Sequence, residues 1–240
     1  MSTHPQRGRA IQRKQRRGPL PIFYIILALI AIVGIAAIGT LALRNRQTIT
    51  SAGAPLARAP LNAPTGLTEQ GYYYKGQPDA PVTVVEYADF QCPGCAFFAT
   101  RMEESIDRDY VETGKVRFIY HDFPLQQHPN AIPAAEAARC AGDQNAFWAM
   151  HDMLFANQAQ WESLAQPGSQ FSAYAGQLKL DRAAFEQCLS SGKHRTAILQ
   201  AQQESMQASI NQTPTFVIDG KQVDATALRA EIDAALASKQ

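Results

Sequence analysis

The sequence predicts an α/β domain that carries a helical insertion and follows a single transmembrane helix. Three patterns support this prediction: an uncharged apolar run at residues 22–43, a strand–helix–strand pattern over residues 81–123, and helical patterns from about residue 128 to residue 209. The chain has 240 residues, of which 46% are hydrophobic and 4 are cysteines. It is therefore too apolar for a disordered chain and too poor in cysteine for a disulfide scaffold.

Charge divides the chain into a basic and an acidic part. Residues 1–68 hold 9 Lys/Arg and no Asp/Glu, whereas residues 69–240 hold 13 Lys/Arg and 21 Asp/Glu, which gives +9 and −8. The acidic part does not suit a nucleic-acid partner, because phosphate contacts need clustered Lys/Arg. We interpret residues 1–21 as a basic cytoplasmic tail; RNA or DNA binding by this tail is the alternative, which a neighbouring membrane span disfavours.

The apolar run at residues 22–43 predicts a helix that spans the lipid bilayer. A helix of this length reaches about 33 Å, which is enough to cross a bilayer core. A cleaved signal peptide is the alternative, but its apolar stretch is normally only about 7–15 residues long. Six basic residues precede the run and few follow it. The sequence thus predicts a single-pass protein of the cell membrane with a cytoplasmic N-terminus and an extracytoplasmic domain.

Residues 44–70 are rich in Ala, Pro, Thr and Gly and show neither helical nor strand periodicity. We expect a flexible linker here, followed by the soluble domain at residues 71–240.

The domain is expected to begin with a β-α-β unit. Residues 81–90 are rich in β-branched and aromatic side chains and predict a strand, a helical pattern follows from Cys92, and residues 115–123 predict a second strand. After the helical insertion, residues 215–223 predict two strands joined by a turn at Asp219-Gly220, and a terminal helix ends the chain. Cys92 therefore lies where a strand meets a helix.

The chemistry is predicted to lie in Cys92-Pro93-Gly94-Cys95. Two intervening residues bring the sulfurs within disulfide range, and the helix N-terminus stabilises a thiolate on the first cysteine. Half of a zinc site and an inert structural pair are the alternatives, but zinc sites of this kind need a second closely spaced pair, and only one CxxC occurs. No metal and no dissociable cofactor are implied, because the cysteine pair is itself the redox centre.

The run from Glu86 to Cys95 (EYADFQCPGC), the helical block and the late TPTFV at residues 213–217 together resemble the DsbA family of thiol:disulfide oxidoreductases. The resemblance covers about residues 72–240 and implies a thioredoxin-like fold with a helical insertion. It places the buried acid of that family on Glu86, where the alternative is a solvent-facing position on an edge strand. It places the cis-proline on Pro214, where a trans peptide bond is the commoner case.

The same resemblance implies that Pro93, Gly94 and Thr213 line the substrate-binding surface beside the catalytic Cys92 and Cys95. The chain departs from the family at Gly94, since strongly oxidising members often carry a histidine before the second cysteine. An unusually acidic Cys92 thiol therefore cannot be carried over from the resemblance.

These features predict a membrane-anchored oxidoreductase that introduces disulfides into exported proteins by dithiol–disulfide exchange. The resemblance implies a quinone-linked membrane partner that reoxidises the cysteine pair. One alternative is a reductase or isomerase on the same fold, although no GxxxG pattern in the apolar run indicates a dimer. The other is a redox-silent binding module tethered to the membrane.

Cys140 and Cys188 are predicted to form a structural disulfide, because two remaining cysteines of one domain in an oxidising compartment most simply pair with each other. Two buried free thiols, or a second redox pair, are the alternatives. Four histidines show no metal-ligand spacing and are expected at the surface or in helix packing: His121, His128, His151 and His194. Trp148 and Trp161 are expected to pack within the helical block.

Overall fold

The structure, a computed structural model, describes residues 61–239. Among these residues, no helix combines the length and the apolar character that a membrane crossing requires. The predicted basic tail, the predicted transmembrane helix at residues 22–43 and the first part of the predicted linker lie outside the described residues.

A six-stranded sheet forms the centre of the described domain, in the order β1-β2-β4-β3-β5-β6. Only β3 and β4 run parallel, and the other neighbouring pairs are antiparallel. The strands are β1 (Thr65–Leu67), β2 (Tyr73–Lys75), β3 (Val82–Ala88), β4 (Val116–Asp122), β5 (Thr215–Ile218) and β6 (Lys221–Val223). Strands β3 and β4 are the pair that the β-branched runs of the sequence predict.

The predicted helix after Cys92 is present but is divided into three pieces. These are α2 (Pro93–Arg101), α3 (Glu103–Ile106) and a π-helical turn at Asp107–Val111. Together with β3 and β4 they complete the predicted β-α-β unit.

Strand β1 corrects the predicted linker, because it lies inside residues 44–70. It pairs antiparallel with β2 at the edge of the sheet, so the folded domain begins before residue 71. Three residues are too few to show the alternation by which a strand is recognised. The ring of Tyr74 lies against Gly66, where a Cβ atom would approach the phenolic oxygen to 2.8 Å, so β1 needs a glycine at this contact.

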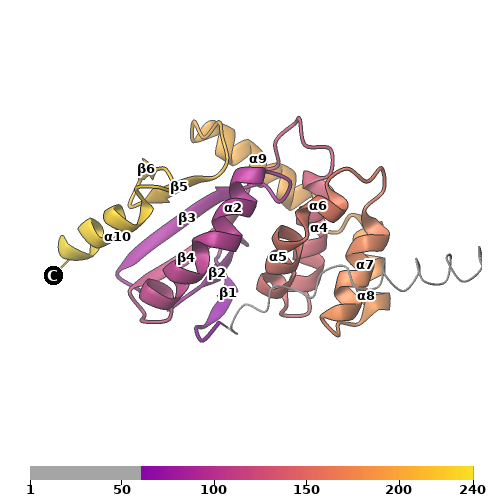
Figure 1. The fold of residues 1–240 in the computed structure, drawn as a ribbon, viewed down its shortest axis with the longest axis horizontal. Coiled ribbons are helices and arrows are strands. Elements are labelled where there is room, and N and C mark those ends of the chain that lie inside the picture. The colour runs from indigo at the N-terminus through magenta and orange to yellow at the C-terminus, as the bar shows by residue number, and fades with distance from the viewer. Residues whose placement is uncertain (1–60, 240) are drawn as a thin grey trace, which may run out of the picture. The chain divides into compact units, whose positions relative to one another are not determined.

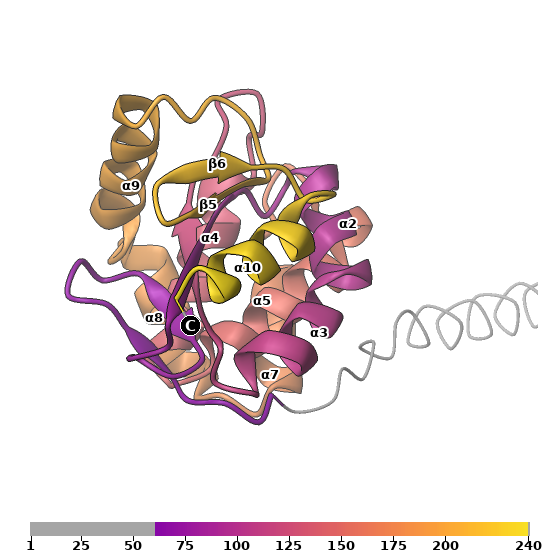
Figure 2. The same ribbon diagram turned by 90° about the vertical axis from the view of Figure 1, so that its left-hand side faces the viewer.

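Helices cover both faces of the sheet (Figures 1 and 2). Helices α2, α3 and α10 (Leu228–Ala237) share one face, where their apolar side chains pack with Val84, Phe118 and Phe216 of the strands. Helix α9 (Arg195–Gln207) lies on the other face and contacts β4. The face that α2 covers is the one that bears the active-site chemistry.

The helical insertion lies between β4 and β5. Besides α9 it comprises α4 (Ala131–Gly142), α5 (Phe147–Ala156), α6 (Gln158–Trp161), α7 (Gly168–Gln177) and α8 (Arg182–Ser191). Its apolar core is continuous with Phe90 and Cys95, so it supports the active-site helix directly. Trp161 is buried in this block as expected, whereas Trp148 also reaches the sheet, where its Nε1 donates to the Tyr74 carbonyl oxygen at 3.2 Å.

Candidate active site

Cys92 caps the N-terminus of α2, which the strand-to-helix pattern predicts. Its backbone is extended (φ −73°, ψ 124°), its carbonyl oxygen accepts the N–H of Ala96 at 3.1 Å, and Pro93 occupies the first helical position. Proline suits that position because its missing N–H would have no helical partner there. Cys95 lies one turn further and is fully buried, whereas Cys92 keeps 7% of its surface. Both cysteines are therefore buried, and Cys92 is the one that retains some exposed surface.

The pKa values of the two thiols are shifted in opposite directions. The pKa of Cys92 is lowered to about 5, and the largest cause is a hydrogen bond from the Cys95 thiol. The contact to Thr213 and the backbone N–H groups of Cys95 and Gly94 also lower this pKa, whereas burial acts in the opposite direction. Burial, followed by the hydrogen bond to Cys92, raises the pKa of Cys95 well above its usual range. Cys92 is therefore the thiolate and Cys95 the protonated partner at neutral pH.

Thr213 and Pro214 close one side of the site. The Thr213–Pro214 peptide bond is cis, and the Thr213 carbonyl oxygen lies 3.3 Å from Cys92 Sγ. A Cβ atom at Gly94 would lie 3.1 Å from Pro214 Cδ and 3.7 Å from Cys92 Sγ. The structure thus gathers Gly94, Thr213 and Pro214 around the Cys92 sulfur, and the glycine leaves room between the helix and the proline.

Glu86 lies inside the domain, on central strand β3. It pairs with Tyr120 on β4 and with Phe216 on β5, and only 1% of its surface is exposed. Neither carboxyl oxygen has a hydrogen-bond partner among the described residues. Burial, followed by the charge of Glu103, raises the pKa of Glu86 well above its usual range. The solvent-facing alternative is wrong, and the carboxyl group is suited to hold a proton near Cys95.

Asp89 fixes the loop that leads into Cys92. One carboxyl oxygen accepts the N–H of Gln91 at 2.7 Å, and the other accepts the N–H of Leu125 at 2.8 Å and contacts His128 Nδ1 at 2.7 Å. Gln158 of α6 adds a second support, since its amide donates to the carbonyl oxygens of Phe90 and Cys92. The sequence does not predict either support, because an isolated polar residue shows no pattern that identifies its partner.

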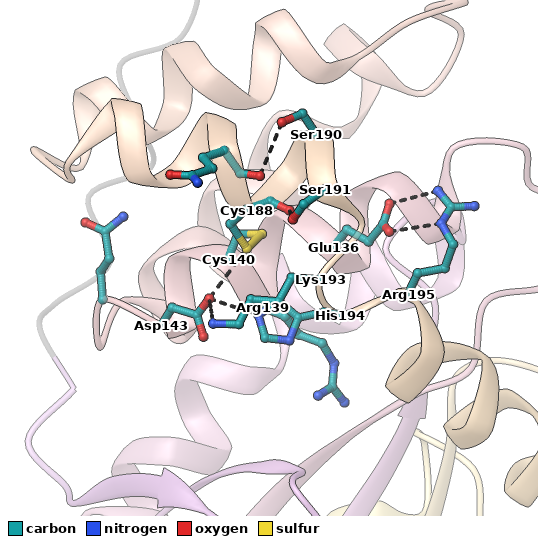
Figure 3. The surroundings of a disulfide bond; sticks show 12 residues. Glu136, Arg139, Cys140, Asp143, Cys188, Ser190, Ser191, Lys193, His194 and Arg195 are labelled. Atoms are coloured by element: carbon teal, nitrogen blue, oxygen red, sulfur yellow. Dashed lines mark hydrogen bonds and ion pairs between the residues drawn. A yellow bond between two sulfur atoms is a disulfide. The ribbon is translucent and has the colours of Figure 1, made fainter.

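The predicted disulfide joins the two insertion helices α4 and α8, with the Cys140 and Cys188 Cα atoms 5.8 Å apart (Figure 3). Asp143 lies beside it, where its carboxylate accepts from Lys193 at 2.8 Å and contacts His194 at 3.0 Å. The Cys140, Cys188 and His194 donor atoms lie within 4.8 Å of one another. Because the two sulfurs are bonded to each other, they offer no thiolate to a metal ion.

Fold and site together define a thioredoxin-like domain with a cysteine pair at the N-terminus of a helix, in which Cys92 is slightly exposed and Cys95 is fully buried. A family model described as thioredoxin matches residues 68–237, and the chain belongs to this family.

Solved structures share the fold. BdbD from Bacillus subtilis aligns with a TM-score of 0.64 and 24% identity over 73% of this chain and 99% of that one. The α-DsbA1 protein from Wolbachia pipientis aligns with a TM-score of 0.64 and 23% identity over 72% and 94%. The resemblance to DsbA proteins that the sequence predicts is thereby confirmed at the level of the fold.

Curated relatives differ in length from this chain. A Na(+)/H(+) antiporter NhaA 1 from Salinispora arenicola is 36% identical over 150 residues, which are 62% of this chain but 22% of the antiporter. A Rickettsia bellii protein named "Putative protein-disulfide oxidoreductase" is 27% identical over 67% of this chain and 63% of its own length. The part of the antiporter that this chain matches is thus only about a fifth of the antiporter's length.

Proposed function

We propose that this protein is a thiol:disulfide oxidoreductase that introduces disulfides into exported proteins through Cys92 and Cys95. One observation carries the proposal. The Cys92 sulfur lies at the N-terminus of α2, beside Thr213, and the hydrogen bond from Cys95 together with neighbouring donors lowers the pKa of Cys92 to about 5. A stabilised thiolate favours the reduced form of the pair, and a pair that prefers to be reduced oxidises its substrates.

The reaction proceeds by two exchanges. A substrate thiolate attacks Cys92 Sγ of the oxidised pair, the Cys92–Cys95 bond breaks, and Cys95 leaves with a proton drawn from Glu86. A second substrate thiolate then attacks the substrate sulfur of the mixed disulfide and releases the Cys92 thiolate. Two electrons pass to the cysteine pair, and the substrate gains one disulfide.

The functional test combines two measurements on the purified domain. We expect the oxidised protein to restore activity to a reduced, unfolded substrate enzyme, and its Cys92/Cys95 potential to be less negative than about −270 mV, the thioredoxin value. A potential at or below that value, with disulfides removed rather than added, would establish the reductase alternative. Absence of exchange in both directions would establish a redox-silent binding module.

We also propose that residues 22–43 anchor the protein in the cell membrane, with the tail at residues 1–21 in the cytoplasm and the domain outside. The basic residues before the apolar run support this orientation. A membrane partner that accepts the electrons of Cys92 and Cys95 fits the same placement. Protease added to spheroplasts that produce the full chain should digest the domain. Full protection of the domain would reverse the proposed orientation. A mature N-terminus that begins after residue 43 would show that the apolar segment is cleaved off.

A further inference from the structure

Lys75, Glu103 and Asp107 form a buried cluster of ion pairs behind the active-site helix. Lys75 of β2 forms ion pairs with Glu103 of α3 and, at 2.7 Å, with Asp107 of the π-helical turn. Lys75 is 1% exposed and Glu103 is fully buried. Burying charges is costly even when they are paired, so such a cluster calls for a role beyond stability.

The strand register places this cluster on the same face of the sheet as Glu86. Lys75 pairs with Phe118 of β4, and Tyr120, two residues further along β4, pairs with Glu86. Partners in register point to the same face, and so do residues two apart. The charge of Glu103 is the largest influence on Glu86 after burial, and the charge of Glu86 acts in turn on Cys95. The buried acid and the cluster are thus electrostatically linked.

His151 of α5 connects this cluster with the surface. It is fully buried, and its ring packs edge-on against Tyr120 with the centroids 5.3 Å apart. Nε2 lies 4.0 Å from Glu103 Oε2, and Nδ1 lies 2.9 Å from Asp152 Oδ1. The Asp152 side chain is 35% exposed. One imidazole nitrogen therefore lies near the buried Glu103 carboxylate and the other contacts a carboxylate that reaches solvent.

Packing alone explains the aromatic contacts of His151 but gives no reason for both nitrogens to face acids. The titratable side chains that contact the ring are Glu103 from α3, Tyr120 from β4 and Asp152 from α5 itself. Lys75 lies beyond the Trp148 ring, with Nζ 4.6 Å from its centroid. An imidazole between two acids can accept a proton at one nitrogen and release one from the other.

We propose that His151 and Asp152 form the path by which protons pass between the buried Glu86–Glu103 pair and solvent during each redox cycle at Cys95. The inference rests on the proposed function. When the pair is reoxidised, the Cys95 proton passes to Glu86 and on through Glu103, His151 and Asp152. Cys92 first forms a mixed disulfide with a disulfide oxidant and releases one oxidant thiolate. The Cys95 thiolate then attacks Cys92 Sγ, breaks this mixed disulfide and displaces the second oxidant thiolate, so two electrons pass to the oxidant. In substrate oxidation the proton moves the opposite way.

The test follows reaction of the reduced protein with excess oxidised glutathione, quenched with acid and analysed by mass spectrometry. The first step adds glutathione to Cys92, and the second closes the Cys92–Cys95 disulfide and releases glutathione. We expect Asp152→Asn to slow the second step about tenfold and His151→Gln about a hundredfold, since positioned proton transfer contributes at least that much, while the first step is unchanged. High concentrations of a small buffer should restore the second step in Asp152→Asn.

Asp79→Asn at an exposed loop position and His194→Gln beside the structural disulfide are the matched controls, and both should keep wild-type rates. An unchanged second step in both test variants would overturn the proton path. Equal slowing of both steps, without buffer rescue, would also overturn it by showing a structural effect. Because glutathione replaces the protein substrate, failure of the proton path is distinguishable from failure to oxidise proteins.

Discussion

Replacing Cys92 by Ser is expected to abolish disulfide transfer, whereas Cys95→Ser should trap substrates as stable mixed disulfides on Cys92. The reason is the unequal exposure of the sulfurs: Cys92 Sγ is reachable beside Thr213, and Cys95 is fully buried. In Cys95→Ser the Cys92 thiolate attacks the disulfide of an oxidised substrate and forms a mixed disulfide, and the release by attack of Cys95 on Cys92 Sγ is lost. Gels without reductant and mass spectrometry of the trapped peptides measure the outcome. Trapping through Cys95 in the Cys92→Ser variant would contradict the assignment.

The pH dependence of Cys92 alkylation in the wild-type protein tests the assignment of Cys92 as the reactive thiolate. The hydrogen bond from Cys95 is the main cause that lowers the pKa of Cys92 to about 5, so the thiolate is fully formed at neutral pH. Alkylation of the reduced protein at Cys92 should be almost independent of pH above pH 7 and should fall about tenfold per unit well below pH 5. A midpoint near the ordinary cysteine pKa of about 8.5 would contradict the site geometry.

The stability of the reduced protein should depend on the ionisation of Cys92. Its pKa is lower in the folded than in the unfolded chain, so the thiolate stabilises the reduced fold fully above the unfolded pKa. This contribution is lost as the pH falls towards about 5. The oxidised protein has no thiolate, so the reduced form should gain stability relative to it as the pH rises from about 5 towards the ordinary cysteine pKa of about 8.5. Above that pH the raised pKa of Cys95 acts in the opposite direction.

Elements that repeat a pattern over many residues could be predicted from the sequence, and single contacts could not. Strand β3 and the insertion helices carry long apolar patterns, and CxxC at a strand end identifies the reactive pair without any tertiary information. Strand β1 is three residues long and depends on pairing with β2, so it looked like linker. Its existence is decided by an edge contact that no local pattern encodes.

The buried cluster shows why part of the site escaped prediction. Lys75 is the last residue of a short strand, and Glu103 lies in a helical segment with several charged residues. The local sequence pattern therefore predicts a solvent-exposed side chain at both positions. Only the register of β2, β4 and β3 places Lys75 on the face that carries Glu86. His151 is expected from the sequence at the surface or in helix packing, and its approach to Glu103 depends on the packing of α5 against α2.

Removing the disulfide by Cys140→Ala and Cys188→Ala together is expected to destabilise the domain by about 4 kcal/mol in the chain-entropy model. The bond joins α4 to α8 across a separation of 48 residues, and Cys140 lies in the core of the helical block. For a domain of this size the loss corresponds to a melting temperature lower by about 10 °C. Thermal unfolding of the double variant measures this change, with Ser190→Ala on α8 as a control of small effect.

Disulfide transfer by the double variant should stay near the wild-type rate at low temperature, because the Cys92 and Cys95 surroundings include neither Cys140 nor Cys188. A loss of transfer at temperatures where the variant is fully folded would assign the second pair a redox role instead. Peptide mapping without reductant tests the pairing itself. If protein isolated from its native compartment yields Cys140 and Cys188 as alkylatable thiols, the stabilising role is wrong, and the two residues act as buried apolar side chains.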